Sequence, residues 1–219
     1  MSRIAHTLVA LLAAGAAAGV SAQPISLTAT LTNAQEGPSV IPTTTTGAPR
    51  PASFGTATFT INDAHTSMSF SATVSNIDFT GTQTADTNDN LTNAHIHAGA
   101  GPGATAGVVW GFIGMPFNDN NPMDAVVTPF ATGVGGMVTG KWDAPEGQGT
   151  TFAAQLNNIL AGLSYINFHT VQFGSGEVRG QILAVTAVPE PETTALVAIG
   201  LGMLAAWTRR RGRLSNRQA

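Results

Sequence analysis

Two short histidine motifs have the spacing of a metal site. His95 and His97 flank a single isoleucine, so in a β-strand both imidazoles project from the same face. His169 comes later in the chain and, in a strand, shares a face with Tyr165 and Asn167. Two imidazoles on one strand and a third from a neighbouring strand would complete a three-nitrogen site for copper or zinc. We therefore predict His95, His97 and His169 as ligands of one metal ion.

A hydrogen-bond network is the alternative explanation of the same residues. Imidazoles that bond to Glu36, Asn167 or loop carbonyls would hold long loops against the sheet without a metal. In both interpretations His95 lies on the strand face away from the core, because Ile96 points to the opposite face. The metal site requires the strand of His95 to lie beside the strand of His169, which the sequence alone leaves open.

The elements that position these residues are β-strands. Apolar and polar side chains alternate over residues 25–32, 56–61 and 67–74, which is the pattern of strands with one buried face. Residues 62–65, Asn-Asp-Ala-His, suit a tight hairpin turn between the last two of these strands. Further strands are expected at residues 94–98, 107–113, 136–142, 164–170 and 177–185.

Short strands with Thr-, Gly- and Pro-rich connections predict an all-β fold, either an antiparallel β-sandwich or a Greek-key barrel. One short helix is expected at residues 151–161. Phe152, Leu156, Ile159, Leu160 and Leu163 recur at three- and four-residue spacing, and Gly162 ends the helix. Long loops carry binding functions in many sandwich folds. Three are expected here, at residues 33–52, 75–93 and 115–134.

Charge and composition argue against several classes of function. The whole chain has a net charge of −3, but residues 23–188 contain three basic residues against ten acidic ones, a net charge of −7. We therefore do not expect nucleic acid as a partner, because phosphate binding needs clustered basic residues. The chain has no cysteine, hence neither a disulfide nor a thiol nucleophile, and no serine lies in a nucleophile elbow. Binding is therefore favoured over catalysis.

The N-terminal residues have the pattern of a secretory signal peptide. Arg3 is followed by an apolar run over residues 8–20, and small residues precede a cleavage position after Ala22. We expect residues 1–22 to be removed by signal peptidase and the rest of the chain to be exported.

The C-terminal residues have the pattern of a sorting signal. Pro189-Glu190-Pro191 precedes an apolar run over residues 193–207, and an arginine cluster begins at Arg209. The basic end is expected in the cytoplasm. The apolar run is 15 residues long, shorter than the roughly 20 of a comfortable membrane-spanning helix, which favours a processed segment over a permanent anchor. A membrane anchor that is retained is the alternative.

This C-terminal segment resembles the PEP-CTERM sorting signal of Gram-negative bacteria. The resemblance implies that an exosortase-type membrane protease cuts near Pro189, Glu190 and Pro191 and releases the protein toward the cell surface or an exopolysaccharide matrix. Membrane contact would then be transient and limited to the C-terminal segment. The expected organisation is a signal peptide at residues 1–22, one β domain at residues 23–187 and the sorting signal at residues 188–219.

The β domain resembles a CHRD domain. The similarity rests on four motifs read together: Leu-Thr-Asn-Ala-Gln-Glu-Gly-Pro at residues 31–38, Ala-His-Ile-His at 94–97, Tyr-Ile-Asn-Phe-His-Thr at 165–170, and Gly-Glu-Val-Arg-Gly-Gln-Ile at 176–182. Ser39 and Val40 follow Pro38 where the family often has a second proline. We interpret this departure as loop variation. The resemblance implies a β-sandwich in an extracytoplasmic protein and adds no settled biochemical role.

Two functions follow from these observations. The first is a non-enzymatic binding or structural role at the cell surface or in the exopolysaccharide matrix of a biofilm. The second is copper or zinc binding outside the cytoplasm through His95, His97 and His169, with Asn167, Arg179 and Glu36 beside them. The histidines and Arg179 are distantly similar to the copper half of Cu,Zn superoxide dismutase. A histidine-rich zinc loop and a cysteine pair are missing, so dismutase activity is not expected.

Overall fold

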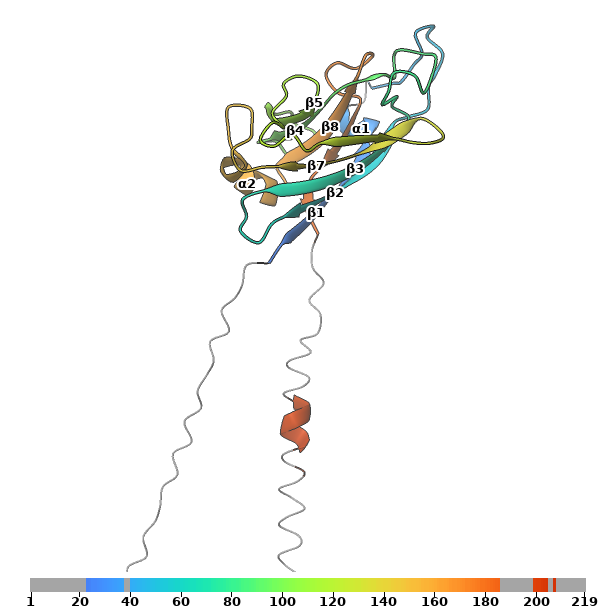
Figure 1. The fold of residues 1–219 in the computed structure, drawn as a ribbon. Helices are drawn as coiled ribbons and strands as arrows, with labels where there is room; N and C mark the ends of the chain where they lie inside the picture. Colours follow the sequence, from blue (N-terminus) through green and yellow to red (C-terminus); the bar gives the residue numbers. More distant parts are fainter. Residues whose placement is uncertain (1–22, 38–39, 186–198, 205–206, 208–219) are drawn as a thin grey trace, which may run out of the picture. The chain divides into compact units, whose positions relative to one another are not determined.

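The computed structural model describes residues 23–37, 40–185, 199–204 and 207 (Figure 1). The predicted signal peptide and the Pro189-Glu190-Pro191 motif lie outside the described residues. Residues 199–204 are helical, and among the described residues no helix is both long and apolar enough to cross a membrane. Strands and helices of the β domain are β1 Ile25–Thr32, α1 Asn33–Glu36, β2 Phe54–Ile61, β3 Met68–Ser75, β4 Leu91–Ala98, β5 Val108–Ile113, β6 Val126–Pro129, β7 Gly135–Trp142, α2 Phe152–Leu160, β8 Ser164–Thr170, β9 Val178–Gln181 and β10 Leu183–Ala184.

The strands form one antiparallel sheet in the order β5-β4-β8-β9-β1-β2-β3-β7-β6, with β10 paired to β1. β1, β2, β3 and β7 pair over their full eight-residue lengths without a register shift. Their alternating sequences explain this regularity. One face of each strand is apolar and buried, so a slip of one residue would expose the whole apolar set. The predicted turn at residues 62–65 closes with a hydrogen bond from Asn62 N to Ser67 O of 3.1 Å.

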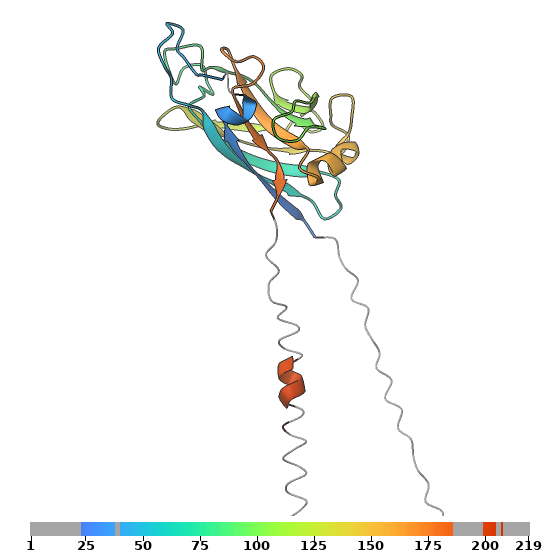
Figure 2. The same ribbon diagram turned by 180° about the vertical axis from the view of Figure 1, so that it is seen from behind.

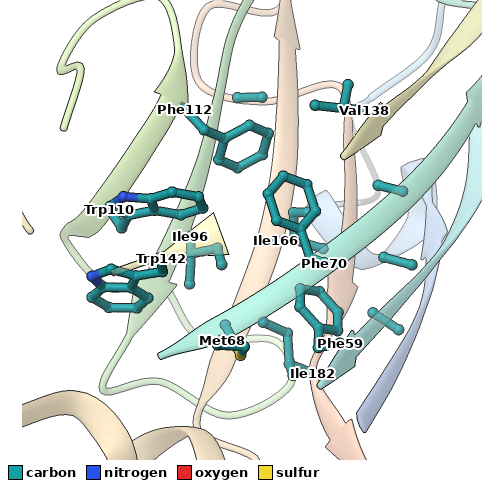
Figure 3. Packing of buried hydrophobic residues seen from close by; sticks show 14 of the residues in the cluster. Phe59, Met68, Phe70, Ile96, Trp110, Phe112, Val138, Trp142, Ile166 and Ile182 are labelled. Atoms are coloured by element: carbon teal, nitrogen blue, oxygen red, sulfur yellow. The ribbon is translucent and has the colours of Figure 1, made fainter. Parts of the chain in front are cut away.

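The sheet curls so that its two halves face each other across one core (Figure 1). Phe70 on β3 contacts Trp110 and Phe112 on β5, with ring centroids 5.8 and 4.7 Å apart (Figure 3). Trp110 also stacks on Trp142 of β7 at 5.8 Å, with the ring planes 3° apart. A curled antiparallel sheet that supplies both layers of its own core confirms the predicted all-β class.

The helix predicted at residues 151–161 is confirmed as α2. Thr151 caps its N-terminus by accepting from Ala154 N at 3.3 Å, and Gly162 has the left-handed backbone, φ +69°, that commonly ends a helix. Phe152 and Ile159 are fully buried against the core. Leu160 and Leu163, which the spacing also assigned to the apolar face, are each 38% exposed, so only part of the predicted face packs on the core.

Three details differ from the predicted elements. A second helix, α1, makes a single turn after Thr32 and lies beside β9 (Figure 2). One turn is too short to produce a helical period in the sequence. The segment expected as one long loop at 115–134 contains β6, an exposed strand held by pairing with β7. The strand expected at 177–185 divides at Ile182, which is buried in the core between β9 and β10.

Candidate metal site

The histidine motifs lie on adjacent antiparallel strands, β4 and β8. In the register of this pair His95 is opposite Asn167 and His97 is opposite Tyr165, while His169 is opposite Asn93. Alternation sends the intervening apolar residues into the core, so the histidines project together from the other face. The sequence predicted this shared face, and the strand pairing makes the two motifs neighbours.

The three imidazoles converge, as predicted. One nitrogen from each of His95, His97 and His169 lies within 4.8 Å of the corresponding nitrogens of the other two. His95 Nδ1 and His169 Nε2 are 3.1 Å apart. Within the described residues this is the one group of three or more potential metal-ligating side chains that meet in this way.

Loops cover the histidines on the face opposite the core. His95, His97 and His169 are only 3%, 8% and 7% exposed, so these side chains are buried although they lie outside the core. Gly111 allows one of these loops to pack closely, because a Cβ there would overlap the carbonyl of Pro116. The histidines therefore form a polar cluster that the loops shield from solvent on one side and the sheet shields on the other.

Each covering loop supplies one backbone carbonyl to one histidine. His95 Nε2 lies 3.1 Å from Met115 O, His97 Nδ1 lies 2.9 Å from Ala106 O, and His169 Nδ1 lies 3.0 Å from Gly174 O. A backbone carbonyl only accepts hydrogen bonds, so each of these outer nitrogens carries the ring proton. The inner nitrogens, which are His95 Nδ1, His97 Nε2 and His169 Nε2, therefore present lone pairs to one another.

Asn167 adds a fourth acceptor to the centre of this cluster. Its Oδ1 lies 3.1 Å from both His97 Nε2 and His169 Nε2. Its Nδ2 donates to Glu36 Oε1 at 3.0 Å, and a carboxylate cannot donate in return, so the amide cannot flip without losing this bond. Gly176 makes the contact possible, because a Cβ at this left-handed position, φ +127°, would overlap Glu36 Oε1.

Burial lowers the pKa of all three histidines. The pKa of His95 falls from 6.5 to about 4, first through burial and then through the neighbouring His169 and His97. Burial is also the largest cause that lowers the pKa of His97 and of His169. Each imidazole is therefore neutral near pH 7 and has one ring proton, the one already directed at a loop carbonyl.

The chain matches the family model of the CHRD domain over residues 27–182. It belongs to the CHRD domain family. A second model, the PEP-CTERM protein-sorting motif, matches residues 187–211. No curated protein and no solved structure matches the chain. A CHRD domain followed by this motif identifies an exported protein of the cell surface that is processed by exosortase-type machinery.

Within the CHRD domain, Arg179 does not contact the histidines directly. Tyr165 stacks on His97, with ring centroids 4.6 Å apart and planes 6° apart, and Arg179 Cζ lies 3.6 Å from the Tyr165 centroid. The three side chains expected beside the histidines therefore differ in how close they come to them. Asn167 and Glu36 adjoin the cluster, whereas Arg179 reaches it through Tyr165.

The sequence named loop carbonyls in general as partners of the histidines, but it identified neither the three that make these contacts nor the stacking of Tyr165 on His97. The period-two pattern already placed Tyr165 on the histidine face of its strand, so that signal was available. No sequence pattern identifies a carbonyl in an irregular loop, because every residue has one.

Proposed function

We propose that this exported CHRD protein binds one copper or zinc ion through His95, His97 and His169. The observation behind the proposal is a shortage of hydrogen-bond donors. The six contacts of the three rings, three to loop carbonyls and three at the centre, have only three ring protons to share. Buried acceptors that face one another without a donor are unfavourable, and a cation at the centre removes this conflict.

The donor set favours copper or zinc over calcium or magnesium. Imidazole nitrogens suit copper and zinc, whereas calcium and magnesium prefer oxygen ligands. The outer ring nitrogens already donate to carbonyls, which is the arrangement that orients metal-ligating histidines. Two nitrogens that bind one ion at about 2.1 Å are at most about 4.2 Å apart. The three inner nitrogens lie within 4.8 Å of one another, so a small rotation of the rings would bring them to binding distance of one ion.

The proposed location of the protein is the cell surface or the exopolysaccharide matrix of a biofilm, where it would bind metal without catalysing a reaction. Residues 1–22 would be removed at export and residues 188–219 would anchor the chain to the membrane only until exosortase cuts. Intact-mass measurement of the surface-associated protein from its native host tests the second part. We expect a mass that excludes Trp207 and the arginines after it, and a retained arginine cluster would contradict the processing model.

Metal analysis of protein purified without a histidine tag tests the metal proposal. After removal of loosely bound ions and reloading with Cu²⁺ or Zn²⁺, we expect one ion per chain. His97→Gln should bind none. His65→Asn is the matched control, since it removes a histidine from the β2–β3 turn, and Asn tolerates the positive φ of 55° there. A parent protein that retains neither metal would favour the hydrogen-bond network instead.

A further inference from the structure

The basic residues of the β domain differ in whether an acidic side chain neutralises them. Arg50 pairs with Glu177 at 2.9 Å, and Lys141 pairs with Asp143 at 3.1 Å. Arg179 is 2% exposed, yet within the described part of the chain it has no carboxylate partner. A buried charge is costly unless it is paired, so this arginine needs an explanation.

The surroundings of Arg179 leave part of its guanidinium group unused. Nη2 donates to Gly101 O at 3.3 Å and reaches Gln181 Oε1 at 3.5 Å, and one face of the group lies on Tyr165. Both acceptors are neutral. Among the described residues Nε and Nη1 have no acceptor, although a guanidinium has five N–H donors.

A hollow of about 220 Å³ lies over Arg179, between α1 and the loop that follows β4. Ala34 and Gln35 line it from α1, and Pro102 and Gly103 line it from the loop. Ala34, Pro102 and Gly103 are exposed, so the hollow reaches the surface. The unpaired positive charge therefore lies at the inner end of a space that a ligand can enter.

We propose that this hollow binds a carboxylate, with the guanidinium group of Arg179 as the recognising element. A planar guanidinium matches the two oxygens of a carboxylate and supplies the missing neutralisation. The carboxylate would belong either to a small free acid or to a uronic acid residue of a surface polysaccharide. The inference does not depend on the metal, because none of the three histidines lines the hollow.

Tyr165 provides a direct reporter of this hollow. It is the single tyrosine of the chain, so a ¹³C-labelled tyrosine ring gives one NMR signal. β4 and β9 flank β8 on opposite sides, and His97 and Arg179 therefore stack on opposite faces of the ring. A carboxylate bound to Arg179 changes the charge next to the ring and shifts that signal.

The test titrates metal-free protein with acetate, galacturonate, a galacturonate trimer and neutral galactose, followed by the tyrosine signal and by calorimetry. We expect a saturable shift with the carboxylates and none with galactose. Arg179→Gln should bind carboxylate roughly tenfold to a hundredfold more weakly, the effect of losing charge-assisted hydrogen bonds. A trimer that binds more tightly than acetate indicates a polysaccharide source, and equal affinities indicate a small acid.

A second variant keeps the test decisive if Arg179→Gln does not fold. Ala34→Phe fills the hollow from an exposed position on α1 and leaves Arg179 in place. It should lose carboxylate binding while its circular dichroism and melting temperature stay near those of the parent. The proposal is overturned if no carboxylate gives a saturable shift, or if Arg179→Gln and Ala34→Phe both bind as the parent does.

Discussion

Two buried polar clusters, which include neighbouring residues of β8, differ in the number of hydrogen-bond donors relative to acceptors. Thr170 belongs to the first cluster, centred on Glu177, which is 0% exposed. The Glu177 carboxylate accepts from Arg50 Nη1 at 3.3 Å, Arg50 Nη2 at 2.9 Å, Thr170 Oγ1 at 2.6 Å and the hydroxyl of Ser53. Four donors meet two oxygens, and one positive charge meets one negative charge.

The histidine cluster begins one residue earlier, at His169, and has the opposite balance. Its inner nitrogens and Asn167 Oδ1 are all acceptors, and the ring protons are already donated to loop carbonyls. Burial is similar in the two clusters, so burial alone does not distinguish a structural cluster from a binding site. The number of hydrogen-bond donors does distinguish them. In the Glu177 cluster every acceptor has a donor, whereas the inner acceptors of the histidine cluster have none and are available to a cation.

The Glu177 cluster is the one whose disruption should cost most. Glu177→Gln removes the ion-pair partner of the Arg50 side chain, which is 5% exposed, and we expect a loss of about 3–5 kcal/mol in the free energy of unfolding. Urea denaturation of the metal-free protein measures it. Lys141→Gln is the matched control, because this lysine is 37% exposed and its pairs should contribute at most about 1 kcal/mol. Equal losses in the two variants would contradict a structural role for Glu177.

The histidine cluster should make the metal-free protein sensitive to acid. The pKa of His95 is about 4 in the folded protein, against an ordinary value of 6.5. Between these two pH values the unfolded chain is protonated at His95 and the folded chain is not. Stability is therefore fully present above pH 6.5 and is lost as pH falls toward 4, by roughly 3 kcal/mol. Urea denaturation across this pH range should show that the free energy of unfolding of His95→Asn falls less steeply with decreasing pH than that of the parent. Identical slopes in the parent and this variant would contradict the prediction.

Metal should stabilise the protein through the histidine cluster alone. At about one hundred times the dissociation constant, Cu²⁺ or Zn²⁺ should raise the free energy of unfolding by about 2.7 kcal/mol. His97→Gln should show no increase, whereas Glu177→Gln, although less stable, should show the same increase as the parent. A loss of the metal effect in Glu177→Gln would mean that the two clusters are one functional unit.

The smallest expected effect separates the neighbours on β8. Thr170→Val removes one of the four donors to Glu177 and should cost about 1.5 kcal/mol, the lower end for a hydrogen bond to a charged group. Its metal affinity should equal that of the parent, although the substitution adjoins His169. Calorimetric titration with Zn²⁺ measures the affinity, and a tenfold change would show that the clusters are coupled through the strand.

Much of the fold followed from local patterns. The alternating residues of β1, β2 and β3 predicted three strands with one buried face, and the spacing of Phe152, Leu156 and Ile159 predicted α2. β6 was missed because its exposed Val-Val-Thr-Pro sequence has no alternation, and its strand conformation comes from pairing with β7. The pairing of Arg50 with Glu177 was also missed, since residues 127 positions apart in the chain leave no local signal.

The sequence by itself determined which side chains share a strand face, because side-chain direction alternates within a few residues. This placed His95 with His97 and His169 with Asn167, and the end segments marked the protein for export and sorting. The tertiary structure decided the rest. Pairing of β4 with β8 brought the two motifs together, and the loops that pack over this outer face directed carbonyls at the outer ring nitrogens and buried the cluster. These features depend on contacts between distant segments, whose geometry arises only when the whole sheet packs on its core.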